Sequence, residues 1–127
     1  MSYQQLNDKL KELKTEDYIW IVYIGIIILS WYSNSLERKF YIYNDKISKD
    51  KYRKIMIIIF IILVIVYLYF LKGAVEDLRK LKPTDSIKKK RLVYLSFLGS
   101  LFVALSGFIF LFIAFSDQEL DVELAFN

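Results

Sequence analysis

Residues 55–71 read IMIIIFIILVIVYLYFL, a run without a single charged residue, glycine, alanine or serine. In water, β-branched residues in such density would indicate a buried strand, but ordinary strands have only about 5–6 residues. In a lipid bilayer, an unpaired strand would also leave its backbone N–H and C=O groups without hydrogen bonds, whereas a helix satisfies them within the segment. The run therefore predicts a transmembrane helix.

Two further apolar segments, residues 18–32 and 92–115, also contain no Asp, Glu, Lys or Arg. As a helix, the longer one would extend about 36 Å, enough for a hydrocarbon core of about 30 Å. The first would extend only about 22 Å, but tyrosine and tryptophan stand at both its ends, as expected at the two membrane interfaces. We predict three spans, with a re-entrant or interfacial helix as the alternative for residues 18–32.

The polar segments predict the remaining helices and their ends. Residues 2–14 carry apolar side chains at helical spacing, which indicates a short amphipathic helix lying on the membrane surface or packed on protein. Thr15, Ser48 and one of Thr84, Asp85 or Ser86 are the expected caps, Asn44–Lys46 the expected turn, and Pro83 the expected stop. The expected long helices are residues 16–43, 48–82 and 85–116, followed by an acidic tail over residues 117–127.

The predicted class is an all-α membrane protein, with residues 1–127 forming one membrane domain of three transmembrane helices and a short N-terminal amphipathic helix. The apolar share of 56% exceeds the roughly 45–50% of soluble proteins and is concentrated in the three spans.

Basic residues predict the orientation, because Lys and Arg in short loops favour the cytoplasmic side. Four of them, Lys88, Lys89, Lys90 and Arg91, precede the third span and none follows it. This places the N-terminus inside and the C-terminus outside a cell membrane. Eleven basic residues then lie inside, and the seven of residues 33–54 lie outside and oppose the assignment.

Small residues in the third span form the clearest local pattern. In lipid, such residues at intervals of about four allow helix backbones to approach closely. They predict a helix-packing face, used within the chain or between subunits, and comprise Ser96, Gly99, Ser100, Ala104 and Gly107.

The chain contains no Cys and no His, which removes the commonest ligands of zinc, copper, haem and iron–sulfur sites. No charge lies within the spans, where ion paths and proton relays usually carry one. We therefore expect no enzyme activity, no cofactor, no metal site and no nucleic-acid partner. Residues 88–91 are expected to act as a topology signal or to contact anionic lipid headgroups.

These features predict a structural or accessory subunit that assembles in the bilayer with copies of itself or with another membrane protein. The first alternative is a passive, membrane-permeabilising pore, and the second is an immunity or lipid-binding protein. Phage holins and bacteriocin-immunity proteins are similar to the chain in size and number of spans, and the abundance of Ile, Lys, Tyr and Asn is typical of a low-GC, bacterial genome. Small holins often end in a basic tail, whereas this chain ends in an acidic one.

Overall fold

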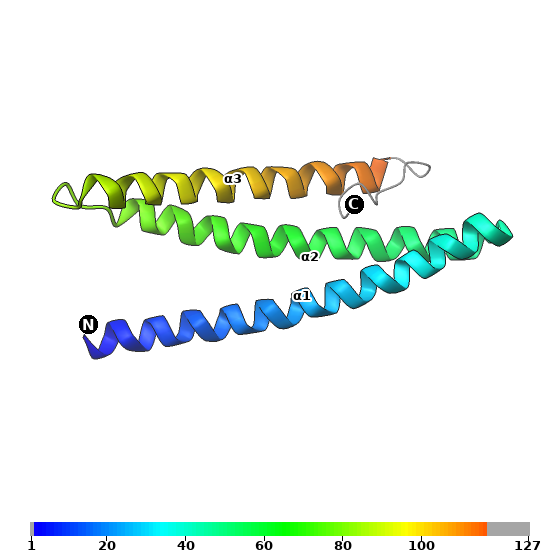
Figure 1. The fold of residues 1–127 in the computed structure, drawn as a ribbon, viewed down its shortest axis with the longest axis horizontal. Coiled ribbons are helices and arrows are strands. Elements are labelled where there is room, and N and C mark those ends of the chain that lie inside the picture. Colours follow the sequence, from blue (N-terminus) through cyan, green and yellow to red (C-terminus); the bar gives the residue numbers. More distant parts are fainter. Residues whose placement is uncertain (1, 117–127) are drawn as a thin grey trace. The chain divides into compact units, whose positions relative to one another are not determined.

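A computed structural model describes residues 2–116, which form three α-helices (Figure 1): α1 (Tyr3–Tyr43), α2 (Lys46–Arg79) and α3 (Ile87–Ser116). All three are long and apolar enough to cross a membrane, and the described residues contain no strand. The predicted all-α class with three membrane-spanning helices is confirmed, as expected for a multi-pass membrane protein. The predicted acidic tail, residues 117–127, lies outside the described part.

The N-terminal segment is helical, but it is the beginning of α1 rather than a helix of its own. Ser2 caps α1 through a reciprocal pair: its hydroxyl accepts from the Gln5 backbone N–H, and the Gln5 side chain accepts from the Ser2 N–H. The prediction of a cap at Thr15 is wrong. Thr15 lies inside the helix, where its hydroxyl donates to the Lys11 carbonyl at 3.1 Å.

A two-residue turn joins α1 to α2, as predicted near Asn44–Lys46. Asn44 ends α1 in the left-handed region, at φ 53° and ψ 38°, a conformation that Asn tolerates well. Asp45 then caps α2, because its carboxylate accepts from the Ile47 backbone N–H and from the Ser48 hydroxyl. The prediction of Ser48 as the cap is therefore wrong: α2 begins at Lys46, and Ser48 is buried in its first turn.

The chain divides into two compact units, residues 1–55 and 56–127. In the first unit, the turn is stabilised by an ammonium over an aromatic ring: Lys49 Nζ lies 5.0 Å from the centroid of the Phe40 ring. Polar side chains are buried here as well, since Ser33 and Glu37 of α1 have exposed fractions of 1% and 7%. The polar segment after the first span thus contributes to the interior of this unit.

In the second unit, α2 and α3 run antiparallel and side by side (Figure 1), joined by residues 80–86. The phenyl rings of Phe60 and Phe110 stack at 5.9 Å between centroids. Pro83 occupies the second position of a tight turn in which the Asp85 N–H donates to the Lys82 carbonyl. Because of this turn, α2 ends at Arg79 and α3 begins at Ile87, each a few residues inside the predicted bounds.

Large apolar side chains remain exposed along the helices. Only 17% of the most apolar segment of α3 is buried, and Phe112 and Ile65 are 70% and 62% exposed. Monomeric soluble proteins rarely expose contiguous apolar surface on this scale. Hydrocarbon is the surrounding in which such faces are stable.

Candidate functional site

The polar side chains of residues 2–116 carry hydroxyl, amine, guanidinium, amide, indole and carboxylate groups, and none is a thiol or an imidazole. This part of the chain contains no group of three or more His, Cys, Asp or Glu residues that could hold a metal ion. Side chains of chemical interest meet at two places: the contact between α2 and α3, and the polar end of the same helix pair.

Gly107 of α3 lies directly against α2. A Cβ atom added at Gly107 would lie 2.9 Å from Cδ2 of Tyr67 and 3.3 Å from Cγ2 of Val64. Both distances are shorter than the roughly 3.5–4.0 Å that two carbon atoms prefer. The glycine is needed here because α2 occupies the space that a side chain would take.

Two alanines extend this contact along α3. Ala104 and Ala114 have exposed fractions of 3% and 2%, and their spacing from Gly107 places all three on one helical face. Ser100 lies one turn before Ala104 on that face and is half-buried. These residues make up what we term the α2–α3 seam, which is the close-packing arrangement expected of small residues in lipid.

Of the remaining two residues of the predicted packing face, Ser96 lies one turn before Ser100 on the same helical face, whereas Gly99 lies farther round the helix. Ser96 and Gly99 are exposed, and no heavy atom outside its own helical turn lies within 4 Å of a Cβ added at Gly99. Four of the five small residues thus follow the face of α3 that meets α2, whereas the surface over Gly99 is open in the chain by itself.

Hydrogen bonds organise the basic run at the start of α3. Ser86 caps the helix by accepting from the Lys89 backbone N–H at 3.1 Å, as predicted for one of the three candidate residues. The Lys89 ammonium donates to the Asp85 carboxylate at 3.3 Å, and the Lys90 ammonium donates to the Pro83 carbonyl at 3.1 Å. Two of the four basic side chains therefore hold the turn in place.

Asp85 is the centre of this turn. Its carboxylate accepts from the Lys82 backbone N–H at 2.8 Å, and this hydrogen bond, together with Lys89, lowers the pKa of Asp85 below its ordinary value. Asp45 is the corresponding residue in the other turn, where the hydrogen bond from the Ser48 hydroxyl is the largest cause that lowers its pKa. Both carboxylates thus serve the turns as hydrogen-bond acceptors.

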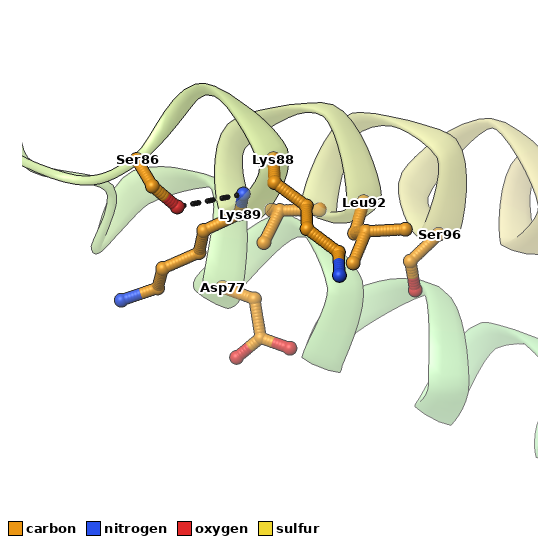
Figure 2. Close-up of a pocket in the computed structure, with 7 residues that line it drawn as sticks. Asp77, Ser86, Lys88, Lys89, Leu92 and Ser96 are labelled. Carbon is orange, nitrogen blue, oxygen red and sulfur yellow. Dashed lines mark hydrogen bonds between the residues drawn. The ribbon is translucent and has the colours of Figure 1, made fainter.

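The other two basic side chains, Lys88 and Arg91, form no hydrogen bond or ion pair with any residue of the described part. Lys88 lines a pocket of about 350 Å³ between the end of α2 and the start of α3. Figure 2 shows Lys88 extending along α3 toward Leu92 and Ser96, whereas the Lys89 side chain points away from them. The full lining comprises Asp77, Ser86, Lys88, Lys89, Leu92, Val93 and Ser96.

The sequence alone does not indicate Asp77 as a site residue. It lies on α2 beyond the apolar run, at a position that periodicity marks only as polar, and the fold of the turn brings it to line the same pocket as Lys88. Its carboxylate, like the Lys88 ammonium, has no side-chain partner among the described residues. The pocket therefore contains one free charge of each sign.

No family model matches the chain, and neither a curated protein nor a solved structure is similar to it.

Proposed function

We propose that this protein is a structural or accessory subunit of a membrane assembly, in which its helices pack against copies of itself or against another membrane protein. The observation that carries the proposal is the open surface over Gly99 on α3. The chain's own helices occupy the space over Gly107, whereas a second helix could approach Gly99 as closely as α2 approaches Gly107. Backbone approach of this kind favours helix association in lipid, where hydrophobicity alone does not.

The absence of Cys and His, and of charged residues within the spans, supports the same proposal. An enzyme or a coupled transporter would need reactive or ionisable groups at depth, and those groups are the usual sign of such functions. The Ser106 hydroxyl in the third span forms its hydrogen bond within the helix, because it donates to the carbonyl of Val103 at 2.7 Å.

The test is a native mass measurement of the protein in mild detergent, with chemical cross-linking in the membrane beforehand. We expect a defined oligomer or a co-purifying membrane protein for the natural chain, and its loss in the variant Gly99→Leu. Gly73→Leu is the matched control, because Gly73 lies on α2 and a Cβ there also meets nothing within 4 Å. A natural chain that is only monomeric, with no bound protein, would refute the proposal.

A passive pore is the rival outcome, and dye-loaded liposomes separate the two. An accessory subunit leaves the liposomes tight at protein densities at which the oligomer forms. If the liposomes release a small dye in proportion to the amount of oligomer, the protein is a pore rather than an accessory subunit.

We further propose that the N-terminus and residues 80–91 lie on the cytoplasmic side of a cell membrane, with the opposite end of α3 outside. The support is the charge distribution, since eight basic residues lie in residues 72–91. Because the chain has no native Cys, single substitutions can report the side cleanly. A membrane-impermeant thiol reagent added to intact cells should label Lys46→Cys and should label Lys82→Cys only after permeabilisation, and the reverse pattern would invert the topology.

A further inference from the structure

We propose that the pocket at the α2–α3 turn binds the headgroup of a phospholipid that carries a primary amine. In this site the Lys88 ammonium contacts the phosphate and the Asp77 carboxylate contacts the amine. The proposal is independent of whether the protein forms an oligomer.

The first argument is charge. Lys88 and Asp77 line one pocket without forming an ion pair, and neither side chain has another partner in the described residues. Lys89 also lines the pocket, but Asp85 already neutralises its ammonium. The lining of a pocket of about 350 Å³ therefore includes one residue with a free positive group and one with a free negative group, which matches a ligand with both charges better than a purely anionic one.

The second argument is depth. Asp77 lies about 9 Å beyond Leu71, where the apolar run of α2 ends, and Ser96 lies about 6 Å inside the apolar segment of α3 that begins at Leu92. The pocket thus extends across the boundary between polar and apolar residues. Leu92 and Val93 supply the apolar part of its wall, against which the first carbons of an acyl chain can lie, while Ser96 supplies a hydroxyl.

The third argument concerns the amine. A primary ammonium can donate hydrogen bonds to the Asp77 carboxylate, whereas the quaternary ammonium of a choline headgroup has no N–H to donate. Proteins that recognise quaternary ammonium groups usually surround them with aromatic rings, and the residues that line this pocket include no aromatic side chain. The site should therefore distinguish primary amine headgroups from choline headgroups.

The experiment is a titration of the purified protein in mild detergent, read by native mass spectrometry, with three phospholipids of matched acyl chains. Their headgroups carry a primary amine, choline or an anionic glycerol. The natural chain should bind the primary amine lipid about fivefold more tightly than either of the others, the effect expected of one favourable charge contact. Water-soluble phosphoethanolamine is added as a separate competitor. Competition at millimolar concentration shows that the headgroup alone binds, and its absence shows that the acyl chains are required.

Two variants separate the two charges. Asp77→Asn should abolish the preference for the primary amine lipid over the choline lipid, while Lys88→Gln should weaken binding of all three lipids about fivefold. Asp50→Asn and Lys51→Gln, which change exposed residues near the start of α2, are the matched controls and should leave binding unchanged. Circular dichroism of each variant establishes that it is folded.

Three results would overturn the proposal. One is equal binding of the three lipids by the natural chain. Another is a preference for the anionic lipid that Asp77→Asn increases, which would make the pocket a site for anionic headgroups. The third is an effect of the control variants as large as that of Asp77→Asn and Lys88→Gln.

Discussion

Replacing Gly107 by alanine tests whether the α2–α3 seam is as tight as its geometry indicates. The new Cβ would lie 2.9 Å from Cδ2 and 3.2 Å from Cε2 of the Tyr67 ring, and 3.3 Å from Cγ2 of Val64. Either the Tyr67 ring must tilt away, or α3 must move outward and weaken the neighbouring contacts. The Tyr67 ring can tilt, but Val64 is β-branched and stiff at χ1, so relief of its contact requires movement of the backbone.

Two opposing effects set the size of the change in stability. Alanine in place of glycine within a helix gains about 0.5–1 kcal/mol, because it reduces the conformational freedom of the unfolded chain. Overpacking of a well-packed contact costs about 1–3 kcal/mol. We therefore expect Gly107→Ala to lower the free energy of unfolding by about 0–2.5 kcal/mol.

Gly99→Ala is the matched control on the same helix, because its Cβ meets nothing within 4 Å. Only the gain of helix propensity applies there, so this variant should be as stable as the natural chain or up to about 1 kcal/mol more stable. The difference between the two variants, about 1–3 kcal/mol, isolates the packing cost from the propensity gain.

The measurement is reversible unfolding in mixed micelles with an increasing fraction of denaturing detergent, followed by circular dichroism. A double-mutant cycle with Tyr67→Ala identifies the ring as the cause, since removing the ring should recover about 0.5 kcal/mol or more of the loss in Gly107→Ala. If Gly107→Ala proves as stable as Gly99→Ala, the close approach of α3 to Tyr67 is not a feature of the folded protein.

Two further predictions concern the turns and the helix caps. The pKa values of Asp45 and Asp85 are lowered, mainly by the Ser48 hydroxyl and the Lys82 N–H respectively. The ionised carboxylates therefore stabilise the fold at pH values above their ordinary pKa of 3.8. This stability is lost as the pH falls through the lower pKa values of the folded state. The thermal midpoint of unfolding in detergent should therefore decrease on acidification below about pH 4. This decrease should be smaller in the double variant Asp45→Asn, Asp85→Asn. A decrease of the same size in the double variant would show that other groups cause it. Ser86→Ala should cost about 1 kcal/mol because it removes a cap, whereas Thr15→Ala, inside α1, should cost less than about 0.5 kcal/mol, and equal losses would mean that a helix begins after Thr15.

Sequence reasoning predicts the membrane spans well because their cause is local. A run such as residues 55–71 has only one stable arrangement in hydrocarbon, whatever the rest of the chain does. The turn at Asn44 and Asp45 is similarly local, since an amide that tolerates the left-handed conformation precedes a carboxylate that can accept from the next turn.

The cap predictions were less accurate because several residues compete for one position. Thr15 followed by two acids fits a helix start, but no Gly or Pro interrupts α1 before it, and the hydroxyl can bond equally well to the preceding turn of a continuous helix. Asp45, which lies in the turn itself, caps α2 in place of Ser48, and the Ser48 hydroxyl donates to the Asp45 carboxylate. The rank order of capping residues does not resolve such competition.

Only part of the candidate site could be predicted from the sequence, because the spacing of residues along one helix does not identify the residues of the helix packed against it. The small residues of α3 predict that some face packs closely, but which of them meet α2 depends on the partner: Gly107 lies against Tyr67, whereas Gly99 lies against nothing. The charged pocket is harder to predict, since Asp77 and Lys88 come to line one pocket only once the intervening residues have folded into a turn.

The seam and the pocket are linked by the register between α2 and α3. The hydrogen bonds of Asp85 to Lys82 and Lys89 fix the residue at which α3 begins, outside the apolar segment. Because a helix is rigid, this start decides which residue arrives opposite Tyr67 deep in the span. A slip of one residue would rotate α3 by about 100° and bring Phe108, which is now 47% exposed, toward the ring that only a glycine admits. The polar turn therefore keeps Lys88 and Asp77 in the lining of one pocket and Gly107 beside Tyr67 through the same constraint, so a variant that loosens the turn should disturb both places together.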